Sequence, residues 1–226
     1  MSNCIVEVQN LRKDFNGTSI FRGVNFRIMP RETVSICGNS GSGKTTLVNV
    51  LSLLEPPTQG NIFWQNENVT NANSGKISQL RPKIFGYIFQ QCNLIPELNV
   101  LENLLFPTRI ISIIKKSDIE FAKKLLGQVN LCGIEQRNVS TLSGGERQRV
   151  AAVRAMINHP KIIIADEPTG NLDVKSADAT MDMIMNLCDA HGSSLLLITH
   201  NQRFAERMQT SYVLGNASLK KLSDHL

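Results

Sequence analysis

The segment that most constrains this chain is the run GNSGSGKT, which extends from Gly38 to Thr45. It matches the pattern G-x-x-x-x-G-K-[ST] at every fixed position. An apolar run at residues 34–37 precedes it and indicates a strand, while residues 46–54 follow with the spacing of a helix. Glycines in such a loop let backbone N–H groups turn around phosphate oxygens, and the helix N-terminus adds the positive end of its dipole. A Gly/Ser-rich turn can match by chance, but the flanking strand and helix favour a nucleotide triphosphate site.

Two side chains of this loop have defined tasks in the predicted site. The pattern places the Lys44 ammonium on the β- and γ-phosphates and the Thr45 hydroxyl on Mg²⁺. We expect nucleotide contacts along the loop and into the first turn of the helix, at Gly38, Asn39, Ser40, Gly41, Ser42, Gly43, Lys44, Thr45 and Thr46.

Size and composition fit a folded unit of this kind. The 226 residues correspond to one large domain, or to a core with a smaller subdomain. Hydrophobic residues make up 42% and charged residues 19%, which excludes a disordered chain. No apolar run approaches the roughly 18 residues of a membrane span. Five scattered cysteines indicate free thiols in a reducing compartment, and the net charge of +5 does not decide between anionic partners.

Short apolar runs alternate with longer helical patterns, which predicts an α/β fold with a largely parallel sheet. The expected strands are residues 33–37, 84–89, 161–166 and 195–199. The expected helices are residues 43–54, 97–111, 118–129, 146–158, 175–190 and 202–208.

Two regions depart from this alternation. Residues 5–31 and 60–70 indicate short half-polar strands, with turns at Asn16-Gly17, Pro30 and Gly60-Asn61, and predict an antiparallel patch beside the core. Residues 91–157 are mostly helical and lie between two core strands. We therefore expect a helical subdomain inserted into the core, in which a capping box at residues 117–120 starts a helix at Asp118.

Two adjacent acids, Asp166 and Glu167, end the expected strand at residues 161–166. Successive side chains of a strand diverge, so the two should have different tasks. Asp166 fits a ligand of Mg²⁺, held directly or through water, and Glu167 fits a group that polarises water for attack on the γ-phosphate. The pair favours hydrolysis over phosphate transfer to a second substrate.

A second helix start with anion-binding character begins the run LSGGERQR at residues 142–149. Ser143 is a good N-cap residue, and Gly144 and Gly145 expose backbone N–H groups at the positive end of the helix dipole. One nucleotide needs only one such helix start. Either this is an ordinary capped helix, which local physics favours, or it addresses a nucleotide bound to another copy of the chain.

The order of these motifs resembles that of the ATP-binding cassette (ABC) family. Residues 142–148 resemble its signature motif, Gln90 its Q-loop glutamine, residues 171–173 (Asn-Leu-Asp) its D-loop and His200 its switch histidine. Phe15 stands where the family has an aromatic residue that stacks on adenine, although an aromatic residue on a half-buried strand usually belongs to the core. The resemblance extends from about residue 6 to residue 219.

The resemblance implies a fold and a set of ligands. The fold is a single nucleotide-binding domain over residues 1–226, with a P-loop NTPase (RecA-like) core, an antiparallel β subdomain and a helical subdomain inserted at about 91–157. The ligands are ATP and Mg²⁺. Its catalytic residues are Lys44, Gln90, Glu167 and His200, and its metal ligands are Thr45, Gln90 and Asp166.

The resemblance also implies partners. Two copies pack head to tail around two ATP molecules, and Ser143, Gly144 and Gly145 of one copy complete the site of the other. Asp173 is a further expected nucleotide contact. Separate integral membrane subunits contact a groove near Gln90 and the helical subdomain, which places the chain peripherally on the cytoplasmic face of the inner membrane.

Within the family, residues 86–90, 93–96, 100–103 and 165–173 resemble one bacterial group. It contains the ATPases of lipoprotein release, of macrolide and peptide export and of a cell-division complex, and we favour lipoprotein release. Cys92 and the unusually apolar residues 107–117 depart from that group near the expected partner contacts.

Two other functional classes remain open at this point. A soluble ABC-type ATPase acting on nucleic acid or ribosomes usually carries two cassettes or coiled-coil insertions, and this chain has neither, so no nucleic-acid partner is expected. A P-loop kinase is disfavoured by the residues at 143–146 and by Glu167.

Overall fold

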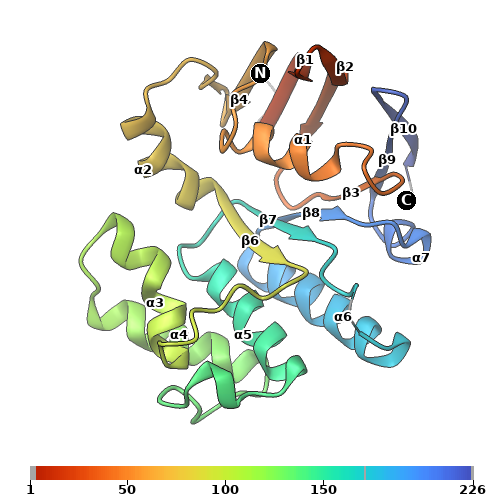
Figure 1. Cartoon of the computed structure of the whole chain (residues 1–226). Coiled ribbons are helices and arrows are strands. Elements are labelled where there is room, and N and C mark those ends of the chain that lie inside the picture. Colours follow the sequence, from red (N-terminus) through yellow and green to blue (C-terminus); the bar gives the residue numbers. More distant parts are fainter. Residues whose placement is uncertain (1–3, 171, 225–226) are drawn as a thin grey trace.

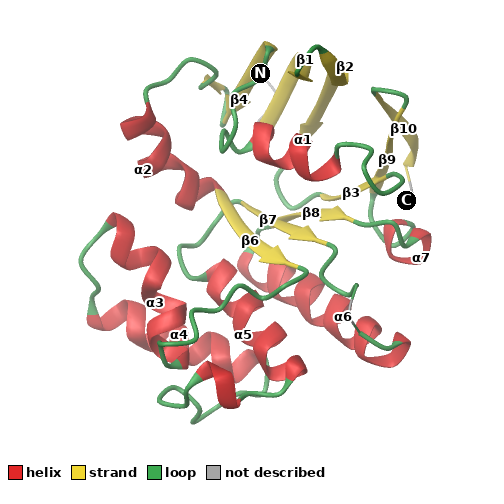
Figure 2. Ribbon diagram, in the orientation of Figure 1, coloured by secondary structure: helices red, strands yellow, loops and turns green. Residues whose placement is uncertain are grey.

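The computed structural model describes residues 4–170 and 172–224, which contain two β-sheets and a layer of helices (Figures 1 and 2). The larger sheet has six strands in the order β10-β9-β3-β8-β7-β6. Its parallel strands are β3 (Thr33–Cys37), β6 (Phe85–Phe89), β7 (Ile162–Asp166), β8 (Ser194–Ile198) and β9 (Thr210–Gly215). At one edge, β10 (Ser218–Asp224) pairs antiparallel with β9. The predicted α/β class with a parallel core is confirmed.

Alternation along β7 and β8 divides the core in two. Ile163 and Leu195 face a cluster that contains α5 (Gly144–Met156) and α6 (Val174–His191). Ile162 and Leu196 face the opposite cluster, which contains α1 (Lys44–Leu51). Both faces of the parallel strands are therefore covered, which explains why these strands are continuous apolar runs in the sequence.

The smaller sheet is antiparallel, as predicted, and has the order β2-β1-β4-β5. Its strands are β1 (Val6–Phe15), β2 (Thr18–Ile28), β4 (Gln59–Trp64) and β5 (Glu67–Asn68). Asn16 and Gly17 join β1 to β2 with φ angles of 48° and 80°, which are the left-handed conformations that a tight hairpin turn needs. In Figure 1, α1 lies between this sheet and β3.

Helices fill the segment between β6 and β7. They are α3 (Val100–Ile111), α4 (Lys116–Gln128), the short 3₁₀ helix η1 (Val139–Thr141) and α5. Figure 1 shows α3, α4 and α5 together on the side of the six-stranded sheet away from α1. The structure thus places a helical layer where the sequence suggested an insertion. A short helix, α7 (Gln202–Ala205), follows β8.

The predicted turn at Gly60-Asn61 is wrong, because both residues lie within β4. Gly60 has a φ of 96°, and a Cβ atom there would lie 2.6 Å from the carbonyl oxygen of Asn10. The pairing of β1 with β4 shifts register in this region, between Gln9 and Arg12. The glycine therefore permits a close backbone approach at an irregular strand pair, rather than a turn.

Two helix starts also differ from the prediction. The α4 helix begins at Lys116 and not at Asp118, because the Asp118 carboxylate accepts the backbone N–H of Lys115 and lies within the first turn. Helix α2 (Ser74–Ile84) was not predicted at all. It buries only Ile77 and Ile84 and contains Pro82, so its apolar period is too weak to recognise.

Among the described residues, no helix combines the length and the apolar character that crossing a membrane requires.

The close approach of β6 and α5 generates a stability prediction. A Cβ atom on Gly86 would lie 2.1 Å from the carbonyl oxygen of Ala155, so Gly86→Ala must displace backbone and should lower the free energy of unfolding by about 1–3 kcal/mol. The matched control is Gly127→Ala in α4, where a Cβ atom meets the Cys132 sulfur at 3.5 Å and helix propensity favours alanine by up to about 1 kcal/mol. Urea unfolding measures both variants, and equal stabilities would contradict this packing.

Candidate nucleotide-binding site

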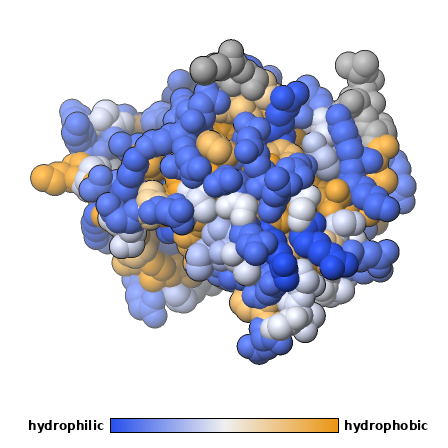
Figure 3. Space-filling view, turned by 90° about the horizontal axis from the view of Figure 1, so that it is seen from above, coloured by the Kyte–Doolittle hydropathy of each residue, from blue (hydrophilic) through white to orange (hydrophobic). Residues whose placement is uncertain are grey.

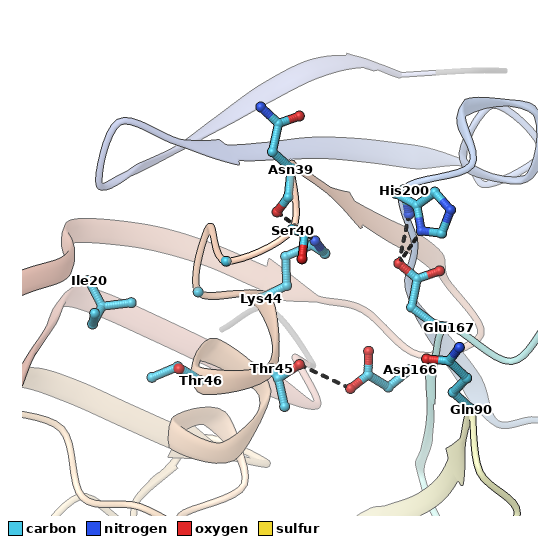
Figure 4. Close-up of a pocket in the computed structure, with 12 residues that line it drawn as sticks. Ile20, Asn39, Ser40, Lys44, Thr45, Thr46, Gln90, Asp166, Glu167 and His200 are labelled. Carbon is cyan, nitrogen blue, oxygen red and sulfur yellow. Dashed lines mark hydrogen bonds and ion pairs between the residues drawn. The ribbon is translucent and has the colours of Figure 1, made fainter. Parts of the chain in front are cut away.

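The site forms where the parallel strands end. Phe89, Asp166 and Ile198 are partners in one register across β6, β7 and β8. The next residue of each strand is therefore brought to the same edge of the sheet, which places Gln90 and Glu167 beside the loop that follows β8. The phosphate loop leaves the neighbouring strand β3 at this edge, so four segments far apart in sequence meet there (Figure 4).

The phosphate loop surrounds one side of a cavity of about 680 Å³. Gly43 precedes α1 with a φ of 96°, and a Cβ atom there would lie 2.4 Å from a methyl carbon of Ile20. Only glycine fits this combination of left-handed backbone and close packing. The Lys44 ammonium lies inside the loop and donates to the carbonyl oxygens of Gly38 and Asn39 at 2.8 and 3.0 Å.

Twelve residues line this cavity: Ile20, Asn39, Ser40, Gly41, Gly43, Lys44, Thr45, Thr46, Gln90, Asp166, Glu167 and His200. The set includes the four predicted catalytic residues and the three predicted metal ligands. Gly38 and Ser42, predicted as phosphate contacts, belong to the same loop but do not line the cavity. The Ser42 hydroxyl is buried there, without a hydrogen-bond partner among the described residues.

Thr45 and Asp166 meet across the cavity floor. The Thr45 hydroxyl donates to Oδ2 of Asp166 at 3.2 Å (Figure 4). Burial raises the pKa of the Asp166 carboxyl, and the neighbouring Glu167 carboxylate raises it further, while the Thr45 hydrogen bond and Lys44 oppose the shift. The two carboxylates lie close together with Lys44 as the neighbouring cation. A further cation beside them would therefore be bound favourably.

Glu167 is held by the loop after β8. Its Oε1 accepts the backbone N–H of His200 at 2.9 Å, and the His200 Nδ1 atom lies 2.8 Å from the same oxygen. The Thr199 hydroxyl donates to Oε2 at 3.3 Å. Glu167 itself has a φ of 46°, a left-handed conformation that costs a non-glycine residue about 1–3 kcal/mol. The carboxylate is therefore fixed in place at the expense of backbone strain.

Gln90 lies beyond the end of β6, close to Asp166 and Glu167 (Figure 4). Its side chain packs on the backbone of Gly170, where a Cβ atom would lie 2.8 Å from the Gln90 amide nitrogen. Gln90 also lines a second cavity, of about 540 Å³, which is bordered by Gly144 and Gln148 of α5. Gln90 thus lines both the first cavity and the cavity beside the helical layer.

The second helix start does not line the first cavity. Ser143 caps α5, because its hydroxyl accepts the Glu146 backbone N–H at 3.3 Å and the Glu146 carboxylate accepts the Ser143 N–H at 2.7 Å. Ser143, Gly144 and Gly145 are all exposed. The structure thus shows the ordinary cap, and it places these three residues outside the cavity that the phosphate loop lines.

A side chain that the sequence analysis did not single out connects these surfaces. Gln148 of α5 is buried, donates to the carbonyl oxygen of Pro168 at 2.9 Å and accepts from the Cys92 thiol at 2.9 Å. Pro168 follows Glu167 directly, and Cys92 lies two residues after Gln90. A glutamine among polar residues at the start of a helix is usually exposed. The sequence therefore did not predict that Gln148 is buried against Pro168 and Cys92.

Two further predicted contacts, Phe15 and Asp173, also lie outside the first cavity. Phe15 is 44% exposed, with the Lys13 ammonium 4.7 Å from its ring centroid, so it is not a core residue. Ile20, which was not predicted, is the apolar side chain at the cavity itself. Asp173 caps α6 by accepting the Ser176 backbone N–H at 3.0 Å. Asn171 of the expected D-loop lies outside the described residues.

The chain is similar to proteins of known family and known structure. Residues 21–170 match a family model described as ABC transporter. The dimeric structure of the ATP-binding cassette MJ0796, in a post-hydrolysis state bound to ADP and Pi, superposes with a TM-score of 0.84 at 30% identity and covers 97% of this chain. The structure of cbiO1 from Clostridium perfringens, at 23% identity and a TM-score of 0.88, supports the fold alone.

Similar proteins with curated descriptions are lipoprotein-releasing system ATP-binding proteins named LolD. That of Hydrogenovibrio crunogenus is 38% identical over 218 residues, which cover 95% of each chain. That of Aquifex aeolicus is 39% identical over 202 residues, which cover 89% of this chain and 90% of its own.

The position of Lys44 predicts its effect on nucleotide binding. Lys44→Ala removes the cation inside the phosphate loop and should weaken ATP binding at least about tenfold, since a hydrogen bond to a charged group contributes roughly 1.5–3 kcal/mol. Titration calorimetry measures the affinity. The control is Lys161→Ala. Lys161 is exposed and directly precedes β7, at the end of the strand away from the site. An unchanged affinity for Lys44→Ala, with a normal melting temperature, would refute the role.

Proposed function

Because this chain belongs to the ABC transporter family, as one of its ATPases, we propose that it powers a membrane complex that releases lipoproteins. The proposal is supported by LolD relatives that are similar over nearly the whole chain and are described as ATP-binding proteins of a lipoprotein-releasing system. The observation that most supports ATP hydrolysis is the position of the Glu167 carboxylate. It lines the cavity and is fixed by a hydrogen bond from the His200 backbone N–H.

ATP is proposed to bind with its phosphates in the loop from Gly38 to Thr46. Lys44 would move from the Gly38 and Asn39 carbonyl oxygens to the β- and γ-phosphates, and the N-terminus of α1 adds its dipole. Phe15 remains the proposed stacking partner of adenine, as its exposed ring permits. Asp173 is proposed as a contact in the assembled site.

Mg²⁺ fits the residues between the phosphate loop and β7. Thr45 and Asp166 approach each other there, and Gln90 lies beside them. The described residues contain no group of three or more His, Cys, Asp or Glu side chains that could hold a metal, which suits an ion held by one carboxylate together with nucleotide phosphates. When bound, Mg²⁺ neutralises charge on the β- and γ-phosphates.

Glu167 is the proposed general base of hydrolysis. Its carboxylate accepts hydrogen bonds from the His200 and Thr199 segment, and it retains capacity to accept a proton from water. His200 is 70% exposed at the cavity rim, where its ring orients the carboxylate and can reach the γ-phosphate. The products are ADP and phosphate, with water as the nucleophile.

Two copies are proposed to form the working unit, packed head to tail. The exposed residues Ser143, Gly144 and Gly145 then face the ATP held by the second copy, which gives the open end of α5 a ligand. The dimer of the related cassette MJ0796 supports this arrangement.

The proposed contact with a membrane subunit is a groove of about 260 Å³ between the core and the helical layer. It is lined by Arg81, Pro82, Phe85, Gly86, Tyr87, Phe89, Phe106, Pro107, Arg154, Ala155 and Asn158. The groove includes Phe89, the residue directly before Gln90. Movement of Gln90 would therefore be transmitted to a partner bound in the groove. We place the chain peripherally on the cytoplasmic face of the inner membrane.

The first test concerns Glu167 as the general base of hydrolysis. Glu167→Gln keeps the shape of the side chain but removes its charge, so phosphate release should fall at least about 100-fold while ATP affinity is retained. Size-exclusion chromatography with ATP should then show a stable dimer. Glu206→Gln, an exposed residue after α7, serves as the control. Near-normal turnover of Glu167→Gln would overturn the assignment.

The second test concerns the partner. Affinity purification from solubilised membranes should recover an integral membrane protein, and Phe89→Ala in the groove should lower its recovery at least about tenfold. Leu222→Ala, at an exposed position on β10, should not.

The recovered complex, reconstituted in vesicles, should release a lipoprotein on addition of ATP. Export of a macrolide or peptide by that complex would contradict lipoprotein release. Recovery of ribosomes or nucleic acid instead of membrane protein would contradict the partner class.

A further inference from the structure

The second half of α3 carries apolar side chains on its outer face. A face exposed to water usually carries polar side chains instead. Phe106, Ile110 and Ile113 are 40%, 69% and 88% exposed. Phe106 and Ile110 are four residues apart and so share one face of α3, and Ile113 follows just beyond the helix end at Ile111, after an extended Ser112. We refer to these three side chains as the apolar stripe. The opposite face of α3, which includes Leu104, is buried in the helical layer. The stripe is therefore turned away from the core of its own chain.

Positive charge flanks this stripe. Arg109 is exposed between Phe106 and Ile110, and Lys115 and Lys116 are exposed where α4 begins. The segment 106–117, FPTRIISIIKKS, contains these three cations and no acidic residue. We refer to residues 106–117 as the α3–α4 tip. The catalytic site uses none of these residues.

The α3–α4 tip projects from the molecule beside the groove. Figure 3 shows hydrophobic atoms protruding at the left edge, the side on which Figure 1 draws the connection between α3 and α4. Phe106 and Pro107 of the tip also line the groove proposed for the membrane subunit. The tip and the groove therefore adjoin, and a membrane subunit held in the groove would lie beside the tip.

Exposed isoleucine and phenylalanine flanked by lysine and arginine are typical of surfaces that enter a bilayer interface. The apolar groups reach the acyl boundary, while the long cationic side chains keep their charges at the phosphates. An anionic leaflet attracts each such cation, and an acidic residue in the tip would oppose that attraction. The absence of acid across residues 106–117 thus complements an anionic lipid surface.

From these observations we infer that the α3–α4 tip inserts into the headgroup region of anionic lipid next to the membrane subunit. The inference rests on the proposed location of the chain at a membrane. Insertion of so few side chains gives weak, reversible binding, which adds to the affinity for the subunit because both contacts are made by adjoining residues of one chain.

The test measures binding of the purified chain to lipid vesicles by co-sedimentation over a range of lipid concentrations. One set is phosphatidylcholine alone, and in the other about a third of the lipid is phosphatidylglycerol. We expect binding to the anionic vesicles only, and weaker binding as salt rises, because salt screens the cations. No nucleotide or membrane subunit is present, so the result is independent of lipoprotein release.

Two double variants separate the contribution of the apolar side chains from that of the cations. Ile110→Ser with Ile113→Ser removes the apolar stripe, and Lys115→Glu with Lys116→Glu reverses the charge; each should weaken binding to anionic vesicles at least about tenfold. The charge control is Arg22→Glu with Arg27→Glu, two exposed cations of β2, and the apolar control is Leu54→Ser. Both controls should bind like the unaltered chain and, like the tip variants, keep their ATPase activity.

Three outcomes would overturn the inference. The unaltered chain does not bind anionic vesicles at all, or the tip variants bind as well as the charge and apolar controls. In the third, the tip variants bind vesicles normally but fail to recover the membrane subunit, which would assign the tip to a protein contact.

Discussion

The parallel register of β6, β7 and β8 determines where Gln90, Glu167 and His200 of the site lie. With Phe89, Asp166 and Ile198 side by side, the residues that follow must emerge at one edge of the sheet. Both faces of these strands are buried, so a slip of one residue would exchange their side chains between the two apolar clusters and disturb the close packing of each. The register thus converts hydrophobic packing into the placement of a carboxylate, an amide and an imidazole around one cavity.

The same placement concentrates negative charge. Asp166 and Glu167 are adjacent in sequence and partly buried, and the pKa of Asp166 is raised by that burial and by its neighbour. Lys44 and Thr45, both from the loop and helix after β3, approach from the other side and oppose the shift. The fold thus places two carboxylates and an ammonium group around one cavity, where each is held by hydrogen bonds within the chain.

Much of this arrangement follows from the sequence. The strand at 33–37, the phosphate loop and the acidic pair at the end of β7 are local patterns, and each is found within a few residues of its predicted place. The left-handed conformation of Glu167, the role of Ile20 at the cavity and the buried contacts of Gln148 depend on residues far apart in the chain, so no local pattern signals them. Helix α2 was missed for a related reason, since only two of its side chains are buried.

Gln148 has a consequence for how two nucleotides in a head-to-tail pair relate to each other. The exposed start of α5 would face the nucleotide of the second copy, whereas Gln148, on the same helix, holds the backbone beside its own Glu167. A displacement of α5 by one nucleotide would then move the backbone beside Glu167, which is the proposed general base for the other nucleotide. Thermodynamic linkage requires that influence to be reciprocal in binding free energy, so the two sites would share one coupling constant rather than act as separate ATPases.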